Sequence, residues 1–93
     1  MTVLMVERVS PSLRGELSRW MIEPRAGVFV GRLSAMVRDR LFELACSRKR
    51  DGAVTLIHQS DCEQGFVIRS QGDTSRRIVD LEGLQLVTIP KQR

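Results

Sequence analysis

The stretch VLMVERVSPSLRG, from Val3 to Gly15, contains a strand and the start of a helix. Its first four residues are apolar and follow no helical period, which predicts a short strand over residues 2–9. Ser10 and Pro11 then indicate a helix start, because Ser caps the first turn and Pro fits the first helical position. An acid, Glu7, and a base, Arg8, stand between them. The chain therefore ends an apolar strand on a carboxylate.

The segment that follows is expected to be one helix and then one or two strands. One face of the helix is apolar, so its side chains, Trp20 included, are expected in the core; they are Leu13, Leu17, Trp20 and Met21. Pro24 is expected to end the helix. Residues 25–33 predict a strand, or a tight strand pair, because two glycines there permit a reversal.

The second half repeats this alternation. Ser34 caps a predicted helix with a buried stripe that comprises Val37, Leu41, Leu44 and Ala45. Residues 53–59 and 64–70 are β-rich runs joined by a short polar loop, which predicts a hairpin. Residues 71–77 are expected to be loop, and residues 84–89 a last strand.

This order predicts an α+β fold, a ferredoxin-like sandwich (βαββαβ) with an extra C-terminal strand. Residues 1–80 are expected to form the domain, and residues 81–93 a strand and tail that dock on a sheet edge or on a partner. Two helices would cover one sheet face. The other face would be bare and partly apolar, which favours a homodimer.

The composition is that of a small basic domain. The 93 residues carry a formal net charge of +4, and 13 of the 15 basic residues are Arg. Arg binds phosphate through a planar fork, so this excess indicates nucleic acid, although a GC-rich genome produces the same bias. No apolar run approaches the ~20 residues of a membrane span. No signal peptide is recognisable, and two cysteines without metal spacing suggest reduced thiols in the cytoplasm.

One stretch is specific enough to suggest a family. SLRGELSRWMIEPRAGVFVGRLSAMVRDRLFE, residues 12–43, resembles the CRISPR-associated Cas-two proteins of the type I-E branch. Further on, Gly65-Phe66, the pair Arg76-Arg77 and VDLEGLQLV, residues 79–87, resemble the same family in the same order. The resemblance implies a homodimer at the centre of the spacer-acquisition complex. This dimer bridges two dimers of the Cas-one integrase and supports double-stranded protospacer DNA.

The resemblance also suggests which residues bind. Arg14, Arg76 and Arg77 match positions where the type I-E family contacts DNA phosphates. Such contacts are independent of base sequence and sensitive to salt. Ser12 and Met36 depart from relatives that have a basic residue there, and Arg19, Arg25, Arg38 and Arg40 could compensate. In the last strand, the residues expected to bind the integrase are Leu84, Leu86, Val87 and Ile89.

Glu7 suggests a second activity. Some relatives are described as metal-dependent endonucleases acting on RNA or duplex DNA, so Glu7 from both protomers could hold Mg²⁺ or Mn²⁺ and serve catalysis. The alternative is that Glu7 forms an ion pair with Arg8, Arg14 or another Arg. A scaffold without catalysis is the preferred interpretation, and a toxin-like RNase is a third. His58, within a predicted strand, is expected to be packed rather than to bind metal.

Overall fold

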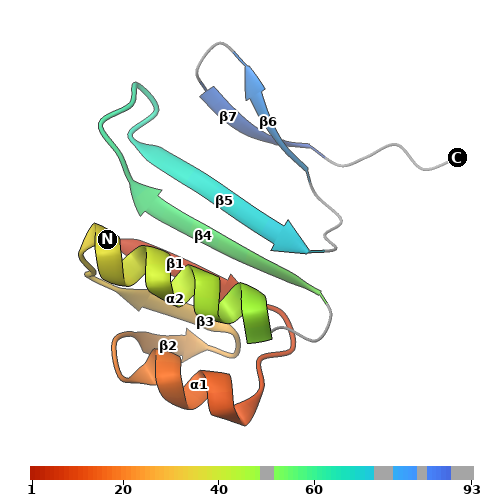
Figure 1. The fold of residues 1–93 in the computed structure, drawn as a ribbon. Helices are drawn as coiled ribbons and strands as arrows, with labels where there is room; N and C mark the ends of the chain where they lie inside the picture. The colour runs from red at the N-terminus through yellow and green to blue at the C-terminus, as the bar shows by residue number, and fades with distance from the viewer. Residues whose placement is uncertain (49–51, 73–76, 82–83, 89–93) are drawn as a thin grey trace, which may run out of the picture.

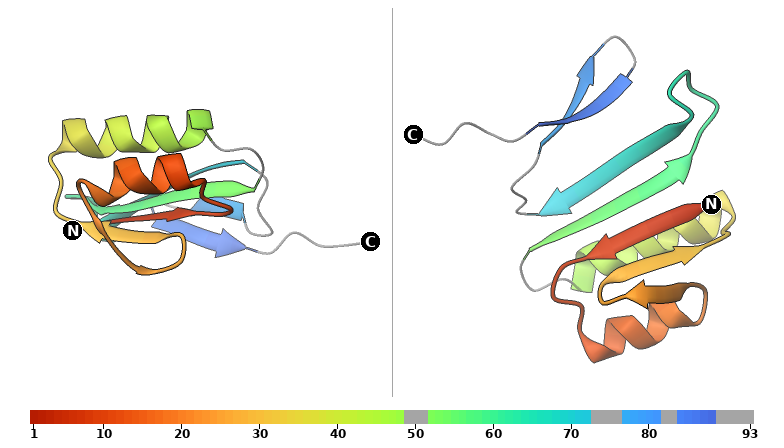
Figure 2. Two further views of the ribbon diagram at one scale, coloured as in Figure 1. Left: turned by 90° about the horizontal axis from the view of Figure 1, so that it is seen from below. Right: turned by 180° about the vertical axis from the view of Figure 1, so that it is seen from behind.

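The computed structural model describes residues 1–48, 52–72, 77–81 and 84–88, with side chains for the first two ranges and for Gln85. A five-stranded antiparallel sheet carries both helices on one face (Figures 1 and 2). In chain order, the elements are β1 (Thr2–Val6), α1 (Pro11–Ser18), β2 (Ile22–Arg25), β3 (Val28–Gly31), α2 (Ala35–Arg48), β4 (Ala53–Gln59), β5 (Phe66–Gly72), β6 (Arg77–Leu81) and β7 (Leu84–Thr88).

The predicted fold class is confirmed. The strands lie in the order β2-β3-β1-β4-β5, and each neighbouring pair is antiparallel. The first four of these, with the two crossover helices, form the ferredoxin-like arrangement. β5 extends the sheet beside β4, while β6 and β7 form a separate two-stranded sheet beside it (Figure 1). In the described residues no helix is long and apolar enough to cross a membrane.

The core lies between the sheet and the helices. Leu4 pairs in register with Phe29 on one side and Leu56 on the other, and all three are buried. α1 contributes Leu13 and Leu17 to this layer. From α2 come Leu41, Phe42 and Ala45. Because alternate side chains of a strand point to opposite faces, the neighbours of Leu4, Phe29 and Leu56 face away from the helices.

Those neighbours form an apolar row on the open face of the sheet. Val30, Val3, Ile57 and Ile68 lie side by side across β3, β1, β4 and β5. Each is half-buried in the single chain. Beside them, the next row consists of Val28, Met5, Thr55 and Ser70. We call these two rows the open face.

The first helix is shorter than predicted. It ends at Ser18, and the N–H groups of both Trp20 and Met21 donate to the carbonyl oxygen of Leu17 as the chain leaves the helix. Residues 22–25, with Pro24, form the edge strand β2, where a missing N–H is tolerated. The prediction that Trp20 lies in the core is wrong, because 53% of it is exposed. It lines an open groove of about 760 Å³ between α1 and α2.

The second half follows the prediction more closely. α2 and the β4–β5 hairpin occupy the expected segments, and Cys62 is an exposed free thiol in the hairpin loop. The expected loop over residues 71–77 is wrong at both ends, since β5 continues to Gly72 and β6 begins at Arg77. The last strand is confirmed as β7, and its main-chain partner is β6.

Candidate nucleic-acid interface

Arg14 is held in place near the start of α1. Ser10 caps the helix, and its side chain accepts a hydrogen bond from the N–H of Leu13. The Nε–H of Arg14 donates to both carboxylate oxygens of Glu23, at 2.9 and 3.1 Å. Glu23 also accepts from the N–H of Gly27 at 2.8 Å. One carboxylate therefore links α1 to β2 and to the turn before β3.

This anchoring leaves part of Arg14 available. The side chain of Arg14 is 42% exposed, whereas that of Glu23 is only 17% exposed. Among the described residues, the contacts of the Arg14 side chain go through Nε, and the two terminal nitrogens have no partner there. A guanidinium fixed on one side and open on the other loses little further freedom when it binds an oxyanion. Arg14 thus has the properties of a phosphate contact.

Arg48 places a second cation beside Ser12. Arg48, the last residue of α2, donates from Nη1 to the hydroxyl of Ser12 at 3.3 Å. Both side chains are exposed. The end of α2 therefore brings a guanidinium next to Ser12 of α1. Local sequence patterns do not reveal this contact, because the two residues are 36 positions apart.

The other predicted contact residues are only partly described. Arg77 begins β6, opposite Thr88 of β7, and only its backbone is placed. Leu84, Leu86 and Val87 belong to β7, again as backbone. Arg76 and Ile89 lie outside the described residues. Their proposed roles remain predictions.

Glu7 directly follows β1 at a sharp turn. Its N–H donates to the carbonyl oxygen of Ala53 at 3.1 Å, and Arg8 then adopts a φ of 54°, in the left-handed region. A β-carbon built on Gly52 would lie 2.8 Å from a carboxylate oxygen of Glu7, so this side chain packs against Gly52. The exposed Glu7 borders a hollow of about 450 Å³ that reaches the open-face residues Met5, Val28 and Thr55.

Of the possible partners of Glu7, namely Arg8, Arg14 or another Arg, Arg14 is wrong, because it binds Glu23. In the described parts of the chain, the ion pairs join Arg14 to Glu23, Arg19 to Glu16, and Arg38 and Arg69 to Asp39. Glu7 takes part in none of these pairs. The sequence could not distinguish Glu7 from Glu23 as the partner of Arg14, since both flank the first helix.

Among the described residues of one chain, donor atoms for a metal are scarce near Glu7. Over residues 1–48 and 52–72, no three His, Cys, Asp or Glu side chains gather where they could share a cation. Mg²⁺ in proteins is typically held by one or two carboxylates and keeps several waters. Glu7 is the carboxylate that the described part of a single chain supplies at this position, so these residues form a sparse donor set for a metal. Only a second copy could add another Glu7.

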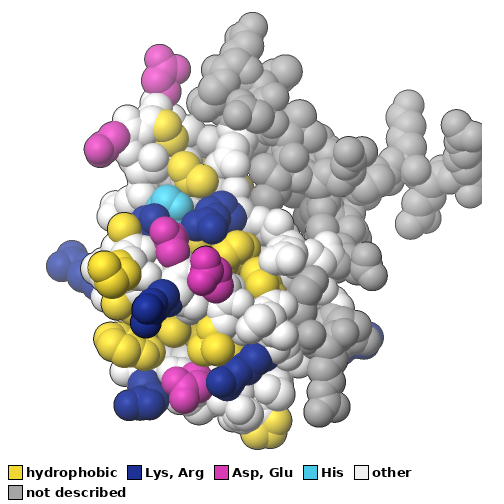
Figure 3. Space-filling model, viewed as in Figure 1, with side chains coloured by type: hydrophobic (Ala, Val, Ile, Leu, Met, Phe, Trp, Pro, Cys, Tyr) yellow, Lys and Arg dark blue, Asp and Glu magenta, His cyan; other side chains and the backbone are white. Residues whose placement is uncertain are grey.

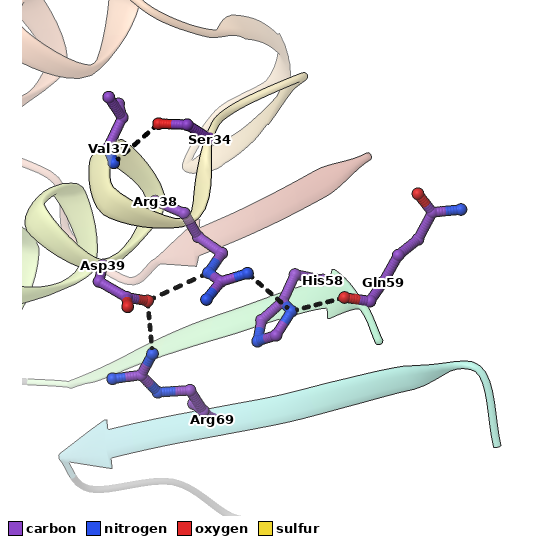
Figure 4. Close-up of polar contacts among 7 residues, drawn as sticks. All are labelled: Ser34, Val37, Arg38, Asp39, His58, Gln59 and Arg69. Carbon is purple, nitrogen blue, oxygen red and sulfur yellow. Dashed lines mark hydrogen bonds and ion pairs between the residues drawn. The ribbon is translucent and has the colours of Figure 1, made fainter. Parts of the chain in front are cut away.

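A charged cluster that sequence reasoning missed joins α2 to the sheet (Figure 4). Arg38 Nε and Arg69 Nη1 both donate to Asp39 Oδ1, at 3.1 and 2.8 Å. The guanidinium of Arg69 also stacks over the ring of Phe42, 4.7 Å from its centroid. The hydrogen bond from Arg38 lowers the pKa of Asp39 most; burial opposes this, and Arg69 adds to the lowering.

His58 completes this cluster and is half-buried, as expected for a packed histidine. Its Nδ1 lies 2.8 Å from the carbonyl oxygen of Gln59 and 3.2 Å from Nη1 of Arg38 (Figure 4). One ring nitrogen cannot donate to the carbonyl and accept from the guanidinium at once. The shorter distance favours a proton on Nδ1, directed at Gln59. Arg38 also binds Asp39 through Nε, and its side chain is only 20% exposed against 42% for Arg14, so it is a weaker candidate for phosphate binding than Arg14.

The remaining candidate cations lie among acids. Figure 3 shows dark blue and magenta side chains interspersed over the helix-bearing face. Arg19, Arg25 and Arg40 are exposed, but Arg19 lies 3.9 Å from Glu16, and Glu43 is on the same helix as Arg40. Met36, the other departure, is 73% exposed. The centre of this face is thus of mixed sign, and Arg14 and Arg48 lie near the ends of their helices.

A comparison with known families supports the resemblance to the Cas-two family. The model of one family, described as CRISPR-associated protein (Cas_Cas2CT1978), matches residues 1–86. The match extends from β1 into β7 and includes Glu7, Arg14, Arg76 and Arg77. It covers nearly all of the 93 residues. The chain therefore belongs to this CRISPR-associated Cas-two family.

Proposed function

We propose that the protein is a scaffold for CRISPR spacer acquisition, of the type I-E kind. Two copies form a dimer that binds duplex protospacer DNA independently of its sequence and bridges two dimers of the Cas-one integrase. Membership of the Cas-two family supports a role in adaptation. The observation that carries the DNA-binding role is the guanidinium of Arg14, which Glu23 holds by its Nε while its terminal nitrogens stay available.

Dimerisation is supported by the open face. Four apolar side chains cross the sheet in one row there, and each keeps part of its surface accessible in the single chain. Apolar surface of this kind is stabilised when a second copy covers it. A two-fold dimer uses the same patch on both subunits. It also doubles every phosphate contact, so weak individual contacts act together on one duplex.

DNA binding is assigned to Arg14, Arg48, Arg76 and Arg77. Arg48 supplies the charge that Ser12 does not. Contacts to phosphate position a duplex without reading its bases, which suits a protein that handles arbitrary spacers. Integrase binding is assigned to β7 and the residue after it, through Leu84, Leu86, Val87 and Ile89.

The DNA-binding proposal is tested by fluorescence anisotropy with two duplexes of unrelated sequence over a range of salt concentrations. Arg14→Ala and Arg48→Ala are each expected to weaken binding about tenfold, because a charge-assisted hydrogen bond is lost in each subunit. The slope of log affinity against log salt should decrease by about one to two units. Arg32→Ala is the matched control, because it removes one exposed Arg near the other end of α2.

Equal affinity for both duplexes is part of this expectation. Unchanged salt slopes in both variants, or a strong preference for one duplex, would contradict the proposal. The pair Arg76→Ala and Arg77→Ala is tested in the same way, and a loss comparable to that of Arg14→Ala is expected. DNA binding that survives all four substitutions would refute the assignment of these residues to DNA binding.

A second candidate function is a metal-dependent endonuclease in which Glu7 from both protomers holds Mg²⁺ or Mn²⁺. It is favoured by the position of Glu7, which is exposed and borders the hollow beside the open face. Glu7→Gln decides between the two functions, with Glu43→Gln as a control on the exposed side of α2. The scaffold predicts normal spacer acquisition with Glu7→Gln. Loss of acquisition in a folded dimer, with loss of metal-stimulated cleavage, would establish the nuclease instead.

A further inference from the structure

The β6–β7 hairpin is attached to the main sheet by side-chain amides. The Oε1 atom of Gln85, in β7, accepts from the N–H of Ile68 at 2.6 Å, and its Nε2 donates to the carbonyl oxygen of Ile68 at 2.8 Å. The side chain of Gln64, in the β4–β5 loop, makes the same two hydrogen bonds to the main chain of Gln85. Its Oε1 accepts from the N–H of Gln85 and its Nε2 donates to the carbonyl oxygen of Gln85, both at 2.8 Å.

These four hydrogen bonds imitate two rungs of a β-ladder. A carboxamide presents one acceptor and one donor side by side, as a peptide group does, so it can satisfy both main-chain groups of a strand residue. Ile68 lies on β5, the edge strand of the five-stranded sheet. Its N–H and C=O would otherwise be open to pairing with another chain. The reciprocal pair of Gln64 and Gln85 is named the amide clasp below.

The hairpin needs such an attachment. In the described residues, β6 and β7 share main-chain pairing only with each other, and β5 pairs only with β4. A two-stranded hairpin alone is marginally stable in water. The clasp bonds are partly buried and join residues 17 to 21 positions apart, so they fix the hairpin relative to β5.

We propose that Gln64 and Gln85 are positioning residues: the amide clasp fixes β7 along the edge of β5 and thereby sets where β7 meets a protein partner. The second part rests on the proposed function, which assigns integrase binding to β7. The first part depends on this chain alone. Both require that an amide, with its donor and its acceptor, occupy residues 64 and 85.

Gln85→Glu tests this requirement because it changes one group. A carboxylate still accepts from the N–H of Ile68, but it cannot donate to the carbonyl oxygen; a protonated carboxyl can do both. Hydrogen exchange of the Ile68 amide, corrected for its intrinsic rate, should show protection about tenfold lower than in the wild type at about pH 7. Protection should recover toward about pH 4, as the carboxyl binds its proton.

Three further variants sharpen the test. Gln64→Glu should lower the protection of the Gln85 amide in the same pH-dependent way. Gln71→Glu, an exposed position of β5, is the charge-matched control and should leave both amides protected at either pH. Gln85→Ala should lower protection at every pH, because it has no carboxyl to protonate. Ile68 protection that is unchanged in Gln85→Glu, or lowered without recovery in acid, would overturn the clasp.

The partner part is measured separately, by binding of the purified integrase to each variant at about pH 7. Gln85→Glu is expected to weaken binding about tenfold and Gln71→Glu to leave it unchanged. Wild-type protein that fails to bind integrase would refute the docking assignment while the exchange data still support the clasp. If Gln85→Glu binds integrase normally although its Ile68 amide has lost protection, the positioning role is refuted and the clasp itself is not.

Discussion

Glu23 shows how much of this fold depends on one carboxylate. It accepts the N–H of Gly27 and the Nε–H of Arg14, and so connects α1, β2 and the turn into β3. Gly27 has a φ of 81°, and a β-carbon there would lie 2.5 Å from the carbonyl oxygen of Val6. The turn therefore requires glycine, and its N–H points at Glu23. That hydrogen bond lowers the pKa of Glu23 most; burial opposes the shift, and Arg14 adds to the lowering.

An acid titration of stability follows from these pKa shifts. A carboxyl whose pKa is lower in the folded state stabilises the fold above its ordinary pKa, and the contribution disappears as pH falls through the folded value. Glu23 and Asp39 have the same sign. The free energy of unfolding, from urea titrations, is expected to fall below about pH 4.5. Glu23→Gln should flatten this fall, whereas Glu43→Gln should not. Parallel curves for all three proteins would contradict the assignment.

At the scale of elements, periodicity predicted both helices and most of the strands, but it predicted neither β6 nor the end of the first helix. Leu13, Leu17 and Met21 keep the helical spacing, and all three are buried. Met21 reaches the core from the turn after the helix, because pairing of Ile22 with Val30 of β3 extends the chain there. Trp20 has the same spacing and faces the groove. The residues after Ser18 could continue the helix or join an edge strand. Pairing with β3 selects the strand, and the local pattern cannot reveal this pairing.

The candidate site was likewise only partly predictable from the sequence. Glu7 was indicated by its place after an apolar strand, and Arg14 by the resemblance to the family. The partners of Arg14 and Ser12, and the contacts among Arg38, Asp39 and Arg69, depend on register between distant segments. Gln64 and Gln85 carry no charge and belong to no motif, so nothing in the local sequence singled them out. Gln85 lies within residues 79–87, which carry part of the family resemblance, but the resemblance implied no role for it.

Trp20 and Met21 provide a matched test of the helix end. Met21 is 5% exposed and Trp20 53% exposed, although both were predicted to be buried. Met21→Ala is expected to lower the free energy of unfolding by about 2 to 5 kcal/mol, through lost contacts and a cavity. Trp20→Ala should cost about 1 kcal/mol or less, as substitutions on the surface do. The measurement is urea denaturation of both variants, and a larger loss for Trp20→Ala would contradict this placement.

At the scale of the whole molecule, the two sides of the sheet differ in polarity and charge. The helix-bearing side is closed by the core and presents charges of both signs (Figure 3). The open face carries the apolar row of Val30, Val3, Ile57 and Ile68. Glu7 borders this face at one end of β1, and the amide clasp secures its edge at Ile68. Glu7 and the hairpin-bearing edge therefore both border the face that is assigned to the dimer.

Ile57→Lys tests the dimer at the centre of that row. Ile57 lies between Val3 and Ile68 and faces away from the helices, so a lysine there is tolerated in one folded chain. In a dimer, it would bury unpaired charge, and the dissociation constant should rise by about 100-fold or more.

Analytical ultracentrifugation is expected to give twice the 10.6 kDa chain mass for the wild type and a single chain mass for Ile57→Lys. Met36→Lys, on the opposite side, is the charge-matched control and should remain dimeric. The monomeric variant should also bind duplex DNA more weakly, because one copy offers half the phosphate contacts. A wild type that sediments as a monomer at high concentration, or a dimeric Ile57→Lys, would exclude the open face as the interface.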